Sequence, residues 1–248
     1  MRIWVALSGL LCLLSWGDVQ ADTIEALLQG FYGPDGIANK AEVYTGEMTR
    51  CCLQRTTVGE QSPREARIQS RSLFRNAEHA VYATTMRAGN HVRDWYSFLR
   101  YEQGVWKLGA VRCLALYGPF WIVLQELEGK QHRSDDEEWR YQNMRLTALG
   151  DVELADYFKS NKERLTDLAN HAMARQTAAV TRMARQLFLT SAKLDLDAGW
   201  VEITIGGILD NSVGFLFVPD GKQPPAMTPD AYIMVERLAG NWYLFKTT

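Results

Sequence analysis

The chain has 248 residues, of which 47% are hydrophobic and 23% are charged, a balance that excludes collagen-like, low-complexity and wholly disordered chains. A formal net charge of −2 lacks the basic excess that binding to a phosphate backbone requires, so nucleic acid is not expected as a partner. At this length the chain can bury one large core or two of roughly 100 residues each.

The first 21 residues have the pattern of a cleaved secretory signal. Arg2 precedes an apolar stretch over 3–16, and Val19 and Ala21 stand at the −3 and −1 positions of a cleavage site. The apolar stretch is short for a bilayer span, and an uncleaved N-terminal anchor is the alternative interpretation. No later window holds the ~18 apolar residues of a transmembrane helix. We therefore expect a periplasmic or secreted protein with no membrane span after signal cleavage.

The mature chain keeps the cysteines Cys51, Cys52 and Cys113, and an exported location allows disulfides. One bridge from Cys113 to Cys51 or Cys52 is expected, because a bond between the two adjacent cysteines would close a strained eight-membered ring. The alternative is that all three are buried, unpaired thiols that act as small apolar residues.

The first half of the mature chain is predicted to form one helix and three strands. An acidic first turn and apolar residues on one face predict a short helix over 22–30. Apolar residues then alternate with period two in 79–86, 92–102 and 105–116, and glycine-containing turns separate these segments. This pattern predicts an antiparallel meander.

Helices and then further strands follow. Proline near the start and glycine just past the end predict a helix over 119–128, and Ser134 begins a capping box ahead of a helix over 135–148. Apolar residues at spacings of three to four predict one continuous helix from 151 to about 188. Period-two segments then predict five strands, at 189–197, 200–209, 212–219, 231–238 and 241–247.

A short repeat links the two halves, because Gly-x-Trp-x-Leu occurs twice after a strand-like segment. The repeated residues are Gly104, Trp106 and Leu108 in one half and Gly240, Trp242 and Leu244 in the other. The arrangement resembles the NTF2-like and cystatin-like superfamilies, in which a helix lies across a curved antiparallel sheet. The repeat and the resemblance predict an α+β protein with an N-terminal domain over 22–117 and a C-terminal domain over 151–248, joined by a helical hairpin over 118–150. Such folds host enzymes, small-ligand binders and toxin-neutralising proteins.

The search for reactive groups gives few candidates. The sequence contains no nucleophile elbow, Walker loop, dinucleotide-binding glycine motif or HExxH motif, and its four histidines lack metal-ligand spacing. No cofactor and no metal are therefore expected. His91 and His79 are the candidate general bases, with Asp94 or Glu78 as the carboxylate that would orient the ring. The alternative is that both histidines are exposed at strand ends.

Aromatic side chains are concentrated around the second predicted strand. Alternation places Trp95 and Tyr101 on one face with Tyr82 nearby, and exposed aromatics on a sheet are typical of protein-binding surfaces. The alternative is that the helix over 119–128 covers them.

These observations together favour an exported, non-enzymatic protein that binds a protein partner, of the immunity type or another kind. Its partner-contacting residues would be Trp95, Tyr101 and Tyr82. An NTF2-like enzyme with a histidine base and a carrier of a small apolar ligand are the alternative functions.

Overall fold

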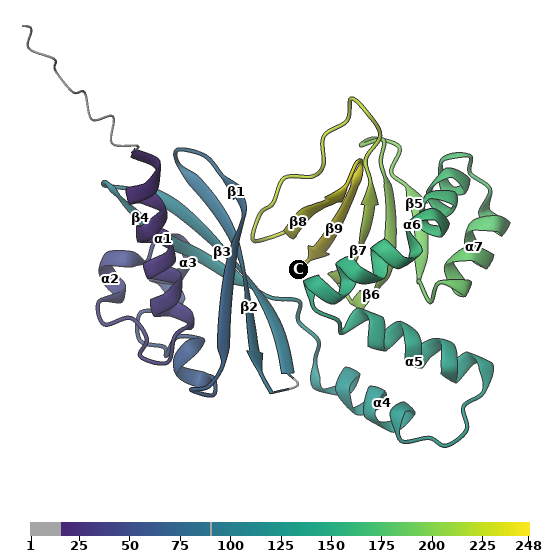
Figure 1. Cartoon of the computed structure of the whole chain (residues 1–248), viewed down its shortest axis with the longest axis horizontal. Helices are drawn as coiled ribbons and strands as arrows, with labels where there is room; N and C mark the ends of the chain where they lie inside the picture. Colours follow the sequence, from purple (N-terminus) through teal and green to yellow (C-terminus); the bar gives the residue numbers. More distant parts are fainter. Residues whose placement is uncertain (1–15, 90) are drawn as a thin grey trace, which may run out of the picture.

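The computed structural model describes residues 16–89 and 91–248. In this part of the chain the protein is α+β, with two antiparallel sheets of four and five strands and no closed barrel (Figure 1). Residues 1–15 of the predicted signal lie outside it, so the signal stays a prediction. No helix in the described ranges has both the length and the apolarity needed to cross a bilayer.

The first sheet is a meander in the order β1-β2-β3-β4. The predicted strands and the predicted helix over 22–30 are present, and β1 is an additional strand that the sequence pattern does not predict. The elements of this half are α1 (Trp16–Tyr32), α2 (Lys40–Val43), α3 (Gly46–Cys51), the 3-10 turn η1 (Gly59–Gln61), β1 (Arg67–Arg75), β2 (His79–Ala88), β3 (His91–Glu102) and β4 (Val105–Arg112).

One face of the first sheet packs under α1. Ile24 and Leu28 of the helix are buried against Leu99, Trp106 and Leu108 of the sheet, so the apolar stripe of the helix and one face of the strands form a single core.

The connector consists of two helices, α4 (Gly118–Glu128) and α5 (Asp135–Thr147), as predicted. The Ser134 hydroxyl accepts from the Glu137 backbone N–H at 3.3 Å, and the Glu137 carboxylate accepts from the Ser134 backbone N–H at 3.0 Å. This reciprocal pair confirms the capping box that the sequence predicts.

The single helix predicted from 151 to about 188 is wrong. Two helices take its place: α6 (Asp151–Met173) and α7 (Thr177–Gln186). Arg175 adopts a φ of 56°, and the Gln176 backbone N–H donates to the His171 carbonyl at 3.0 Å, which closes α6 with a Schellman motif. Glycine is the usual residue at that left-handed position, so an arginine there gives no stop signal in the sequence. The break allows α7 to lie beside the second sheet (Figure 1).

The second sheet contains all five predicted strands. They are β5 (Ser191–Leu194), β6 (Val201–Ile208), β7 (Asn211–Phe217), β8 (Tyr232–Ala239) and β9 (Trp242–Thr247). Their order is β5-β6-β7-β9-β8, so the last strand of the chain lies inside the sheet and β8 lies at one edge. A terminal strand inserted between two others is held by hydrogen bonds on both sides.

Both segments that carry the repeat form hairpins, β3–β4 and β8–β9. Gly104 and Gly240 take positive φ values of 84° and 56° at the two turns. Trp106 and Trp242 each begin the buried side of the following strand and are each 3% exposed. The positive φ explains why glycine stands at both turns.

The largest core cluster joins the two sheets. Ala83 and Tyr96 of the first sheet are buried in the same cluster as Leu154 and Phe158 of α6 and the inner face of the second sheet. The first sheet therefore has both faces covered, by α1 on one side and by α6 and the second sheet on the other. The predicted domain boundaries stay a prediction.

Candidate functional site

The histidine and carboxylate candidates do not come together. His91 and Asp94 are three residues apart in β3, and side chains at that spacing point to opposite faces of a strand. His91 is exposed, whereas Asp94 is 6% exposed and accepts from Thr85 Oγ1 at 2.6 Å and from the Asp151 backbone N–H at 2.8 Å. The expectation that Asp94 orients His91 is therefore wrong. His79 is exposed at the start of β2 and lines a cavity described below.

The three aromatic candidates lie under α1 and not on an open surface. Tyr82 is 6% exposed, and Trp95 and Tyr101 are partly buried against the same core. The Trp95 ring centroid is 6.5 Å from that of Tyr32, a residue of α1 that is fully buried. The expected exposed aromatic face is therefore wrong, because α1, and not the connector alone, covers it.

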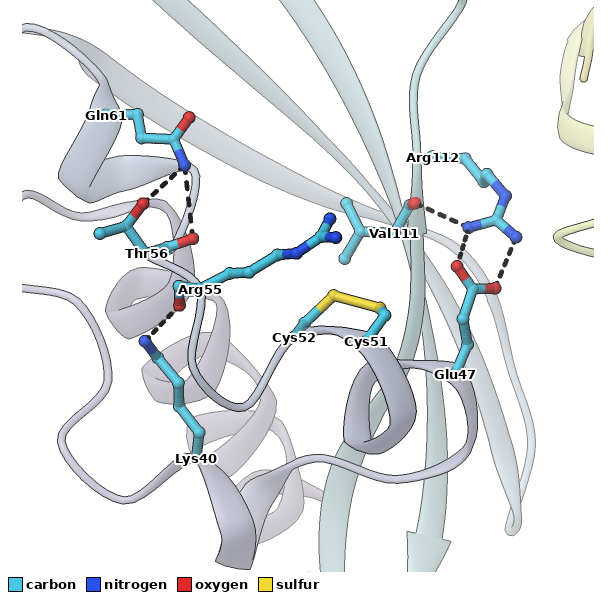
Figure 2. Close-up of a disulfide and its surroundings, with 9 residues drawn as sticks. All are labelled: Lys40, Glu47, Cys51, Cys52, Arg55, Thr56, Gln61, Val111 and Arg112. Atoms are coloured by element: carbon cyan, nitrogen blue, oxygen red, sulfur yellow. Dashed lines mark hydrogen bonds and ion pairs between the residues drawn. A yellow bond between two sulfur atoms is a disulfide. The ribbon is translucent and has the colours of Figure 1, made fainter.

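The expected bridge to Cys113 is also wrong. Cys51 and Cys52 form a disulfide with each other where α3 ends (Figure 2). Cys113 is a free thiol. Cys113 follows the end of β4, within electrostatic range of Arg93 of β3 and Lys246 of β9. Burial raises the pKa of this thiol.

Several buried, mutually paired ionisable groups meet where the two sheets join. Asp151, the first residue of α6, is 3% exposed and accepts from Lys246 Nζ of β9 at 2.7 Å and from the Tyr96 hydroxyl of β3 at 2.8 Å. Its other oxygen accepts from Arg71 of β1 at 2.6 Å. Arg71 also donates two hydrogen bonds to the Glu236 carboxylate of β8, at 2.9 and 2.6 Å. We call these residues, with Asp94, the junction network.

The charges of the junction network set its pKa values. Burial alone would raise the pKa of Asp151, but Lys246 and Arg71 lower it below its usual value. Burial and the nearby Asp151 carboxylate raise the pKa of Asp94, whose oxygen lies 3.6 Å from Lys246 Nζ. Burial works against the charged form of Lys246, but Asp151 and Asp94 raise its pKa.

The junction network is suited to joining parts of the chain. Both oxygens of Asp151 and both oxygens of Asp94 accept hydrogen bonds from within the protein, so these groups are already paired. The network links β1, β3, the start of α6, β8 and β9. In the ranges 16–89 and 91–248, no group of three or more histidine, cysteine, aspartate or glutamate side chains could hold a metal.

Lys246 and Arg71 escape prediction for different reasons. Lys246 follows Trp242 and Leu244 at every second position of its strand, so the alternation itself places this lysine inward, a signal that the sequence does carry. Arg71 lies in β1, a strand without a fully buried residue and therefore without a clear apolar period.

Three of the four sheet edges are covered by other parts of the chain. β1 and β8, edge strands of different sheets, face each other through the Arg71–Glu236 pair. The segment before α3 covers β4, where the Thr45 backbone N–H donates to the Leu108 carbonyl at 3.0 Å. Within the described ranges, β5 is the edge that remains. Every second residue of an edge strand turns its N–H and C=O away from its neighbour in the sheet.

A groove of about 720 Å³ runs between α7 and this open edge. Its apolar lining consists of Trp139, Ala172, Val180, Ala184, Leu189, Ala192, Leu194 and Leu196. Leu196 is 66% exposed, which is unusual for a large apolar side chain. Among the described residues that line the groove, the charged side chains are Arg175, Arg185 and Lys193, and none is acidic. We call this feature the α7–β5 groove.

The sequence pattern misses the α7–β5 groove because it predicts one uninterrupted helix over the region. The groove combines an open strand edge, an apolar wall and an excess of positive charge. These are features of a site that binds an extended polypeptide. Comparisons of the chain with protein-family models, curated proteins and solved structures find no match.

Proposed function

We propose that this protein is an exported, non-enzymatic factor that binds a protein partner, of the immunity type or another kind, by accepting an extended segment of that partner in the α7–β5 groove. The observation that carries the proposal is the open edge of β5 beside an apolar groove. Backbone hydrogen bonds to the edge supply affinity, and alternate side chains of the segment reach the groove wall.

Charge determines the kind of segment that fits. Arg175 and Lys193 make no ion pair with a described carboxylate, whereas Arg185 pairs with Asp136. An added strand that alternates apolar and acidic side chains would bury the first set against Leu194 and Leu196 and bring the second set to the cations. We therefore propose a partner segment in which acidic and apolar side chains alternate along the strand.

We also propose a tandem fold and an exported location for this protein, as its sequence suggests. The two halves are tandem helix-and-sheet units of the NTF2-like or cystatin-like kind, and the two matching hairpins with buried Trp106 and Trp242 support this. The signal-like residues 1–21 support a periplasmic or secreted location.

The test uses a synthetic peptide of alternating leucine and glutamate, with blocked ends, and a lysine-for-glutamate counterpart. We expect the acidic peptide to bind the mature chain and to shift backbone amide NMR signals of β5 and α7. N-methylation of every second peptide amide, at either the odd or the even positions, should abolish binding, and N-methylation of the alternate set should leave it intact. Only one edge of an added strand faces β5, so only one of the two sets of amides donates to it.

Variants identify the groove as the site. Lys193→Glu and Arg175→Glu should each weaken binding of the acidic peptide by about tenfold, since each reverses one charge contact. Arg64→Glu, an exposed arginine outside the groove, is the matched control. Absence of binding at ~1 mM peptide, or equal effects of methylation at both parities, would contradict the proposal.

A further inference from the structure

A second cavity is lined mostly by residues of α3 and the first sheet. It has a volume of about 550 Å³ and lies between the first sheet and residues 227–230 of the long loop before β8. This size is within the range of small-molecule sites. Phe74, Val81, Phe98 and Met227 form an apolar lining, and Phe74 is 45% exposed.

Both carboxylates that line this cavity, those of Glu47 and Asp230, lie close to Arg112. Arg112 forks onto Glu47 at 2.9 and 2.6 Å, as Figure 2 shows, and its guanidinium lies 3.7 Å from Asp230. The same guanidinium donates to the Pro229 carbonyl at 2.8 Å. Arg112 therefore ties the loop to α3 beside the cavity; it pairs closely with Glu47 and only loosely with the exposed Asp230.

The remaining charged groups of the lining are basic. Arg50 of α3 and Arg100 of β3 line the cavity and make no ion pair with a described carboxylate. Arg100 stands directly opposite His79 on β2 and Lys107 on β4. Basic side chains directly opposite one another in a sheet destabilise it unless an anion offsets them. An anion bound beside Arg100 would offset this repulsion.

We propose that this cavity binds a small amphipathic anion, with a carboxylate head on an apolar body. The head would pair with the guanidinium groups of Arg50 and Arg100, which match the geometry of a carboxylate. The body would lie against Phe74, Phe98 and Met227. This site shares no lining residue with the α7–β5 groove, so it stands independently of the proposed peptide binding.

Isothermal titration of the mature chain with decanoate tests the proposal, with decanol and acetate as probes of the body and the head alone. We expect decanoate to bind at one site per chain and at least tenfold more tightly than either comparison probe. The double variant Arg50→Gln/Arg100→Gln should weaken decanoate binding by at least tenfold, because charged hydrogen bonds to the head are lost. Phe74→Ser should weaken it by several-fold.

Arg67→Gln replaces an exposed arginine of β1 outside the cavity and should leave decanoate binding unchanged. Circular dichroism of each variant verifies that it is folded, and the exposed positions of Arg50, Arg100 and Phe74 favour this. Equal affinity for decanoate and decanol, undiminished binding by the double variant, or no binding at ~1 mM would each overturn the proposal. Loss of peptide binding in Lys193→Glu with decanoate binding retained would separate the two sites.

Discussion

Replacing Asp151 by asparagine removes the central negative charge of the junction network with almost no change in shape. Lys246, whose side chain is 4% exposed, then keeps only Asp94 at 3.6 Å as a counter-ion, while Arg71 keeps its fork to Glu236. Removing one partner of a buried ion pair costs about 3–5 kcal/mol. For a chain of this size each kcal/mol lowers the Tm by about 2–4 °C, so we expect a decrease of about 6–20 °C.

Urea unfolding followed by tryptophan fluorescence measures the loss. Asp156→Asn is the matched control, because Asp156 lies one turn or so along the same helix, is 64% exposed and pairs only with the exposed Lys159. The Asp156→Asn variant should change the free energy of unfolding by no more than about 0.5 kcal/mol. The double variant Asp151→Asn/Lys246→Met should cost less than the sum of the two single changes. A loss below about 1 kcal/mol for Asp151→Asn, or strict additivity with Lys246→Met, would refute the reasoning.

Three further predictions concern pH, the cysteines and a glycine. Because the folded protein lowers the pKa of Asp151, its stabilisation is complete above the unfolded pKa and is lost as pH falls through the folded value. The stability difference between wild type and Asp151→Asn should therefore shrink below about pH 4 in urea titrations. Alkylation, in denaturant and without reduction, of a chain that begins at residue 22, followed by peptide mapping, should label Cys113 alone. Labelled Cys51 or Cys52 would contradict the vicinal disulfide. A Cβ at Gly214 would lie 2.1 Å from the Ile203 carbonyl oxygen, so Gly214→Ala should cost about 2 kcal/mol or more in the same assay, whereas Gly118→Ala, with nothing within 4 Å, should change little.

The sequence predicts much of the fold because its apolar periods are clear. Both hairpins, the connector helices and the strands of the second sheet follow from period and turn residues, and the structure contains them. The pattern fails where burial is incomplete or a turn lacks its usual residue. In β1 no side chain is fully buried, and at Arg175 a left-handed turn occurs without glycine.

The candidate sites were much harder to predict, because each depends on contacts between distant parts of the chain. The sequence suggests Asp94 as a partner for a histidine, yet its partners in the structure are Thr85 of β2, Lys246 of β9 and the backbone of Asp151 in α6. The open edge of β5 follows from the strand order and not from the composition of the strand. Local patterns specify elements, whereas these sites arise from how the elements are placed.

The junction network and the α7–β5 groove should serve separable roles. They share no residue: the network lies on β1, β3, the start of α6, β8 and β9, and the groove on α7, the end of α6, β5 and its neighbours. Changes at sites without shared partners usually add independently. We therefore expect Asp151→Asn to lower the Tm without changing peptide affinity at a temperature where it is folded. Lys193→Gln should weaken peptide binding without lowering the Tm, because it places no like charge opposite Glu202. A large change in affinity for Asp151→Asn under those conditions would mean that the partner also contacts, or depends on, the junction between the sheets.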